Sequence, residues 1–253
     1  MARIELRHAT ILIQDGLSGT AVVAANTANT DTDMDINTVN LNTDDTDLVP
    51  VGARFTVNTV NNTTTYTVTG RTPTATSPTT NITFTPAISD GAPGAPPLEN
   101  DIVTFLPSRI EVKVGEGNLT WSEAKEYEYL LDRGDLDTVK EGDEQPLELS
   151  LEFVYEYVLT GTGEAITPVD AVKGSGGAAE WVSSSADPCE PYAVDLIVLH
   201  CVPCGGDEDE RIEFPDFRYE SLEFDLGEAT ISVSGRCNAS EPTITRSNDS
   251  ECA

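Results

Sequence analysis

The amino-acid sequence predicts an all-β protein with one short α-helix, in which a small β-domain is inserted into a larger one. Two long segments, 119–130 and 146–157, alternate apolar or aromatic residues with carboxylates. Their period of two is that of a strand and not of a helix. Residues 20–100 differ in composition, since Thr, Asn, Asp and Pro crowd them and turn signals interrupt them. No segment has the length and periodicity of a long helix.

The opening strand, IELRHATILIQDG, ends at Asp15 and Gly16. Short β-branched or aromatic runs then follow between turn signals such as TGRTP and DGAPGAPP, a spacing typical of a small sandwich or barrel. These runs are 22–25, 34–41, 54–60, 65–69, 82–86 and 102–106. Because a more charged and aromatic texture resumes near residue 106, we interpret 19–105 as an insertion in a loop of a domain formed by 1–18 and 106–253.

Segments 119–130 and 146–157 predict a long hairpin with one apolar and one acidic face. The residues that separate them, DRGDLDTVKEGDEQ, are rich in turn formers and predict a loop. The apolar face is formed by Trp121, Tyr127, Tyr129, Leu147, Leu149, Leu151, Phe153, Tyr155 and Tyr157.

The sequence TPVDAV predicts a short helix after the hairpin. Thr167 suits the N-cap, Pro168 the first helical position and Asp170 the first turn. The glycines of KGSGG end it. Strands return at 192–202, 210–226 and 229–237, and a polar tail closes the chain.

The charge balance restricts the classes of molecule that the protein could bind, because 14 basic and 44 acidic residues give a net charge of −30. Such a chain would repel nucleic acid and anionic membranes. Two interpretations stay open, adaptation to high salt and an ordinary acidic surface. The N-terminal residues are charged at once and carry no long apolar stretch, so we expect synthesis as a soluble cytoplasmic chain.

Nothing in the sequence predicts an enzyme or a bound cofactor. No GxSxG, P-loop or HExxH motif occurs, and His8 and His200 lie inside predicted strands, where structural roles are expected. The run Asp31, Asp33, Asp35 begins like a calcium loop, but Ile36 occupies the position that requires glycine.

All five cysteines lie in the last quarter of the chain. The CVPC pair could form half of a zinc site, a redox pair, a structural disulfide or a pair of packed thiols. A second CxxC is missing, which disfavours zinc, and the strand-rich surroundings disfavour a redox motif. We therefore predict no metal site and a disulfide or thiol cluster drawn from Cys189, Cys201, Cys204 and Cys237, with Cys252 the fifth cysteine.

Two stretches, 110–159 and 214–242, resemble the tail tube (major tail) proteins of long-tailed viruses of bacteria and archaea. The shared features are a long hairpin, here with Arg133, Gly134 and Asp135 in its loop, a short helix and a closing strand that ends near Ser234 and Gly235. The likeness covers 4–16 and roughly 106–246. The insertion at 19–105 departs from the minimal pattern.

The resemblance implies a structural virion protein, located in the viral tail and assembled in the host cytoplasm. In this family, six copies join their sheets edge to edge in a ring, and stacked rings form a conduit through which viral DNA passes without specific binding. The implied partners are the protein itself and other tail proteins, namely the tape measure, the tail terminator, the baseplate or tip, and the sheath if the tail contracts; no membrane is involved.

The resemblance also assigns roles to named side chains, with the insertion on the tube exterior. Carboxylates facing the channel would repel phosphates and let DNA slide. The candidates to line it are Glu126, Glu128, Glu148, Glu152 and Glu156, and the candidates to reach the neighbouring ring are Asp132, Arg133, Asp135, Asp137, Lys140, Glu141 and Asp143.

Two other classes of function compete with this one. A monomeric β-sandwich adhesin or carbohydrate-binding module would have an exposed aromatic patch and would not self-assemble. An enzyme with paired carboxylates on a β-scaffold is the third, although no acid, base or nucleophile is indicated by a motif.

Overall fold

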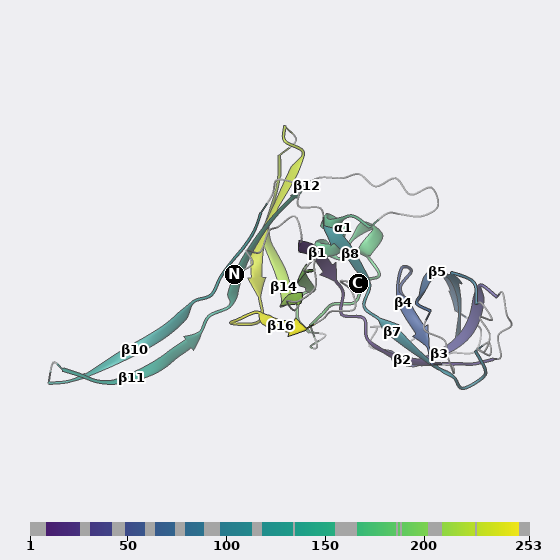
Figure 1. Ribbon diagram of the computed structural model, residues 1–253, viewed down its shortest axis with the longest axis horizontal. Coiled ribbons are helices and arrows are strands. Elements are labelled where there is room, and N and C mark those ends of the chain that lie inside the picture. Colours follow the sequence, from purple (N-terminus) through teal and green to yellow (C-terminus); the bar gives the residue numbers. More distant parts are fainter. Residues whose placement is uncertain are drawn as a thin grey trace. The chain divides into compact units, whose positions relative to one another are not determined.

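The computed structural model is built mostly from β-strands, with one α-helix in the part that it describes (Figure 1). It describes residues 9–25, 31–41, 49–58, 64–73, 79–88, 97–112, 118–133, 135–154, 166–185, 187, 189–201, 209–225 and 227–247. The chain forms two compact units. We call Met1–Gln14, Ile110–Lys173 and Pro191–Ala253 the sheet unit, and Asp15–Arg109 with Gly174–Glu190 the barrel unit.

The barrel unit contains a closed barrel of six antiparallel strands, in the order β2-β3-β6-β5-β4-β7. Their bounds are β2 Gly19–Val23, β3 Asp33–Leu41, β4 Arg54–Val57, β5 Tyr66–Pro73, β6 Thr79–Thr85 and β7 Ile102–Leu106. Each overlaps one of the six β-branched or aromatic runs of the sequence, so the β-strand character expected for these runs is confirmed. Closure leaves the barrel without free strand edges.

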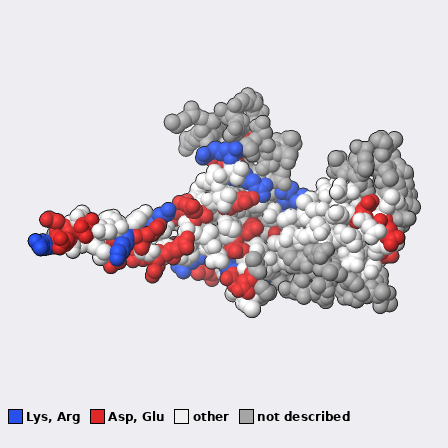
Figure 2. All heavy atoms as spheres, turned by 90° about the horizontal axis from the view of Figure 1, so that it is seen from below, with Lys and Arg blue, Asp and Glu red and all other residues white. Residues whose placement is uncertain are grey.

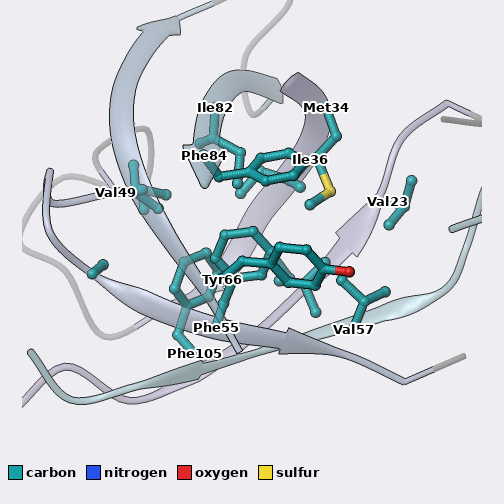
Figure 3. Close-up of a cluster of buried hydrophobic side chains, with 14 of the residues drawn as sticks. Val23, Met34, Ile36, Val49, Phe55, Val57, Tyr66, Ile82, Phe84 and Phe105 are labelled. Carbon is teal, nitrogen blue, oxygen red and sulfur yellow. The ribbon is translucent and has the colours of Figure 1, made fainter. Parts of the chain in front are cut away.

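Aromatic side chains fill the interior of the barrel (Figure 3). Phe55 is stacked on Tyr66 with ring centroids 5.3 Å apart, and Phe84 meets both rings nearly at right angles. Phe105 completes the group at 5.6 Å from Phe55. Since these rings are almost fully buried, the barrel encloses a packed core and not a ligand cavity.

The sheet unit is organised around one eight-stranded sheet of order β8-β1-β13-β14-β15-β12-β9, with β16 also paired to β14. Residue bounds are β8 Arg109–Val112, β1 Ala9–Gln14, β13 Val194–His200, β14 Asp209–Asp225, β15 Thr230–Cys237, β12 Leu147–Val154, β9 Leu119–Ser122 and β16 Thr243–Ser247. Strand β13 is buried on both faces, as expected of a central strand.

Strand β14 belongs to two halves of the sheet, because its first half pairs with β13 and β16 and its second half with β15. The change occurs beside Pro215, which has no N–H to donate, and Asp216, whose φ is 50°. The pairing register of β13 and β14 shifts here, and the Asp216 N–H donates to the Asp195 carboxylate at 2.9 Å. This bulge bends the strand.

The helix α1, Pro168–Lys173, begins where the sequence predicts. Thr167 Oγ1 accepts a hydrogen bond from the Asp170 N–H at 3.2 Å, and the Asp170 carboxylate accepts one from the Thr167 N–H at 3.1 Å. This reciprocal arrangement is a capping box. Gly174, with φ 58°, follows the last helical residue.

The structure corrects the sequence analysis in the hairpin region. The predicted strand 119–130 is two strands, β9 and β10 (Lys125–Asp132), interrupted at residues 123–124. The predicted loop is a ten-residue strand, β11 (Asp135–Glu144), which pairs with β10 in a separate two-stranded sheet. Strand β9 does pair with β12, as the predicted hairpin requires, and the polar tail contributes β16.

The units also have boundaries that the sequence did not indicate. The barrel unit spans residues 15–109 instead of 19–105, and it includes Gly174–Glu190. Arg71 Nη2 contacts Glu180 Oε1 at 2.6 Å, and the Gly16 N–H donates to the Val182 carbonyl at 2.9 Å. These contacts attach the second segment to the barrel.

Candidate functional surfaces

The half of the sheet formed by β9, β12, β15 and the end of β14 separates apolar from polar side chains. Along β12 the leucines and Phe153 are buried, whereas Glu148 and Ser150 are exposed. Residues directly opposite in an antiparallel pair share a face, so the register builds polar rows across the strands. The rows are Thr120–Ser150–Ser234–Ser221, Ser122–Glu148–Arg236–Arg218 and Glu152–Ser232–Glu223.

A shallow hollow of about 410 Å³ lies over this polar face, lined by residues of β9, β12, β14 and β15. The Ser221 and Ser234 hydroxyls share a hydrogen bond of 2.7 Å there. Gly235 is required by packing, because a Cβ at this position would lie 2.0 Å from the Arg218 carbonyl oxygen. The close approach accompanies the register shift between Tyr219 and Ser221.

Arg236 is the basic residue at the centre of the polar face. Its Nη2 lies 3.1 Å from Glu148 Oε1, and its Nη1 lies 3.6 Å from Glu220 Oε1. Arg218 is directly opposite on β14, but its Nε donates to the Pro191 carbonyl at 3.0 Å. Two carboxylates thus lie beside one guanidinium and, with Arg218 counted, two acidic and two basic side chains leave no net positive charge at this point.

The β10–β11 hairpin extends away from the main sheet (Figure 1), and all residues of its two strands are exposed except the partly buried Leu130. The register places Tyr129 opposite Val139 and Leu131 opposite Leu136. Tyr127 continues this row, and all five side chains are about half exposed or more, up to 72% for Leu136. We call Tyr127, Tyr129, Leu131, Leu136 and Val139 the apolar stripe.

The other face of the hairpin is charged, with Glu128 opposite Lys140. Carboxylates predominate along the arm, which lies at the left of Figure 2. At its base a hollow of about 470 Å³ is lined mainly by acidic side chains of both strands and by the 240–241 turn. There the Ser240 hydroxyl donates to Glu144 Oε1 at 2.8 Å.

The predicted channel-lining glutamates do not form one group. Glu148 and Glu152 share the polar face of β12, whereas Glu126 and Glu128 lie on β10 in the separate hairpin sheet. Glu156 is outside the described residues. The predicted inter-ring residues are placed from the end of β10 to β11, all exposed; they are Asp132, Arg133, Asp135, Asp137, Lys140, Glu141 and Asp143. Gly134 is also outside the described residues.

The cysteines have different surroundings. Cys201 is disulfide-bonded and packs on a small cluster of Leu12, Ile197 and Leu199. Cys189 is an exposed free thiol and Cys237 a buried one. Cys204 and Cys252 lie outside the described residues. Among the described residues, no three His, Cys, Asp or Glu side chains are grouped as metal ligands would be.

His200 is half-buried at the end of β13, opposite Ala9 on β1, and His8 is outside the described residues. No helix in the part of the chain that the structure describes combines the length and apolarity needed to cross a membrane.

The sequence did not predict the β11 part of the apolar stripe or the acidic partners of Arg236. Leu136 and Val139 are three residues apart, which does not fit the alternation of a strand. They join one stripe because the pairing of β10 and β11 shifts register between Leu130 and Leu131. Arg236 acquires its partners only through the register of β12, β14 and β15. Gly235, just before it in SGRC, was the available signal of close strand approach.

Comparison with known proteins gives no relative from which a role could be transferred: no protein-family model, curated protein or solved structure matches this chain.

Proposed function

We propose that this chain is a structural subunit that assembles with copies of itself into stacked rings, forming the tail tube of a long-tailed virus. The observation that carries the proposal is the β10–β11 hairpin, which keeps its apolar stripe in solvent. An isolated two-stranded ribbon is marginally stable in water. Burying the stripe against another copy would stabilise the contact by roughly 1 kcal/mol per side chain.

The main sheet supports the same proposal. Its outermost strands in the pairing order are β8 and β9, which could pair edge to edge with neighbouring copies. In such a ring the polar face that carries Glu148 and Glu152 would line the channel. Arg236, balanced by two carboxylates, would offer little attraction to DNA phosphates. Glu126 and Glu128 lie on the hairpin and would contribute where rings meet.

The remaining roles follow from this assembly. The hairpin would contact the next ring, the barrel unit would decorate the outside, and the subunit would be located in the virion tail. Its partners would be its own copies and the other tail proteins named above, with DNA passing through without specific binding.

Electron microscopy with size-exclusion chromatography and light scattering tests the proposal, over a salt series up to several molar. Rings or tubes are expected from the native chain. Replacing Tyr129 and Leu136 by Ser should abolish stacking while circular dichroism stays native. The matched control replaces the cross-strand pair Glu128 and Lys140 by Ser on the opposite face, keeps the net charge, and should still assemble. A compact monomer under every condition would overturn the proposal.

A monomeric adhesin or carbohydrate-binding module is the second candidate. The observation in its favour is that several aromatic side chains of the sheet unit are exposed, namely Trp121, Tyr127, Tyr129, Tyr219 and Phe224. Aromatic platforms are common in sites that bind apolar or sugar surfaces. Binding of the monomer to a glycan array, lost in Tyr127→Ala and Tyr129→Ala without any change in mass, would favour this candidate.

A further inference from the structure

Asp15 is a fully buried carboxyl group in the barrel unit, at the point where the first segment of that unit begins. Its Oδ1 accepts hydrogen bonds from the Ser108 N–H at 2.6 Å and the Leu17 N–H at 3.2 Å. The Asp15 N–H in turn donates to the Ser108 carbonyl at 3.0 Å. Because Ser108 lies one residue before that segment ends, Asp15 joins the two ends of the barrel segment.

A third stretch of chain meets the same point. The Gly16 N–H donates to the Val182 carbonyl at 2.9 Å, and a Cβ on Gly16 would lie 2.2 Å from the Ser183 carbonyl oxygen. The backbones therefore touch, and only glycine fits. Residues 174–190 are thereby held against Asp15 and its neighbours, which makes this a joint of three segments.

The second carboxyl oxygen of Asp15 and the Ser108 hydroxyl are both buried and make no hydrogen bond to the described residues. An ionised carboxylate is costly to bury without donors for both of its oxygens. Burial accordingly raises the pKa of Asp15 from 3.8 to about 7, while hydrogen bonds from Ser108, Leu17 and Val182 act in the lowering direction.

The charged side chains on the elements that pack around Asp15 have partners other than Asp15. Arg54 Nη2 donates to the Pro107 carbonyl at 3.3 Å, and Glu180 contacts Arg71 at 2.6 Å. Arg109 follows Ser108 in the chain and has contacts of its own. The shift at Asp15 comes from burial and hydrogen bonds and from none of these charges.

We propose that Asp15 is a proton-controlled clasp, which holds the three segments together while its carboxyl group is neutral and loosens them when it ionises. In the neutral form the buried Oδ2 carries no charge, so its burial costs much less than that of a carboxylate oxygen. In the ionised form the charge is shared by the buried Oδ2, and the cost of burying it outweighs the hydrogen bonds that favour the carboxylate.

The direction of the pH effect follows from proton binding. Between pH of about 4 and about 7 the folded chain holds a proton on Asp15 that the unfolded chain has lost. The stabilising effect of the clasp is therefore complete below the unfolded pKa. It declines as the pH rises through the folded pKa.

Hydrogen exchange of the full-length chain between pH 5 and 8.5, corrected for intrinsic exchange rates, tests the proposal. Protection of the Gly16, Leu17 and Ser108 amides should fall at least tenfold across this range. Asp15→Asn, which keeps an acceptor and never ionises, should show protection that does not depend on pH. The matched control is Asp101→Asn, since Asp101 caps a turn of the same unit by accepting from the Leu98 N–H at 2.7 Å; it should behave as the native chain.

Equal pH dependence in the native chain and in Asp15→Asn would overturn the proposal. If Asp15→Asn does not fold, the ¹³C carboxyl resonance of Asp15 in the native chain decides the question. A titration midpoint within about one unit of 7 supports the clasp, and one near the ordinary aspartate value overturns it.

Discussion

The indole ring of Trp121 lies 5.4 Å from the phenyl ring of Phe214, centroid to centroid, with 59° between the ring planes. Trp121 is on β9, the outermost strand, whereas Phe214 is on β14, with β15 and β12 between them in the pairing order. The two rings can meet only if the sheet curls across this interval. The bulge beside Pro215 and Asp216 supplies the bend in β14 next to Phe214.

Truncating Trp121 should therefore loosen the curled sheet. We expect Trp121→Ala to lower the free energy of unfolding by about 2 kcal/mol, from the lost aromatic pair and the lost apolar cover. Trp121→Phe should recover part of this. Urea denaturation monitored by circular dichroism measures both. An unchanged midpoint for Trp121→Ala would show that the ring contact does not stabilise the fold.

Gly235→Ala tests the close approach of β15 to β14. A methyl group would meet the Arg218 carbonyl oxygen at 2.0 Å and the Tyr219 Cα at 2.8 Å, both backbone atoms that cannot move away cheaply. We expect a loss of about 3 kcal/mol in thermal or urea unfolding. The control is Gly227→Ala, where the nearest atom is the Asp225 carboxylate oxygen at 3.2 Å; it should cost less than about 1 kcal/mol.

The pair Arg71 and Glu180 should couple the barrel to residues 174–190. Arg71 also donates to the Val49 carbonyl at 2.7 Å, and the Val51 N–H donates to Glu180 Oε2 at 3.3 Å. Because Glu180 is 45% exposed, a double-mutant cycle with Arg71→Met and Glu180→Gln should give a coupling of about 1 kcal/mol that weakens in high salt. A coupling of zero in low salt would contradict this.

Cys237 should be unreactive in the folded chain. Burial first, and then the charges of Asp195 and Asp216, raise the pKa of its thiol from 9.0 to about 12, so the nucleophilic thiolate is scarce at neutral pH. The raised pKa also makes stability depend on pH. The protonated thiol stabilises the fold fully below its unfolded pKa, and this effect is lost as the pH rises towards 12.

Peptide mapping after alkylation at pH 8 checks this expectation. Exposed Cys189 should be labelled within minutes and Cys237 only in denaturant. Labelling of both at similar rates in the native chain would contradict a buried Cys237.

The strands that bury one face could be predicted from the sequence. The alternation of β12 is reproduced residue by residue, from buried Leu147 to buried Phe153. The barrel strands likewise have apolar residues at alternate positions, directed into the core. The capping residues of α1 act locally, and Thr167 and Asp170 could therefore be assigned their roles without tertiary information.

Strand β11 could not be recognised, because burial did not impose a pattern on it. All ten of its residues are exposed, and its composition of Asp, Lys, Glu and Gly matches that of a loop. The attachment of residues 174–190 to the barrel depends on Arg71 and Glu180, which are 109 residues apart. No local signal marks such a contact, and the partners of Arg236 depend in the same way on strand register.

The hydrogen bond of 3.0 Å between the Asp15 N–H and the Ser108 carbonyl has a practical consequence. The barrel segment leaves and rejoins the chain at adjacent points, so its removal opens no gap that a linker must span. A different folded module whose own ends lie close together could be grafted at this joint. Each copy of the chain could then carry a grafted domain in place of the barrel.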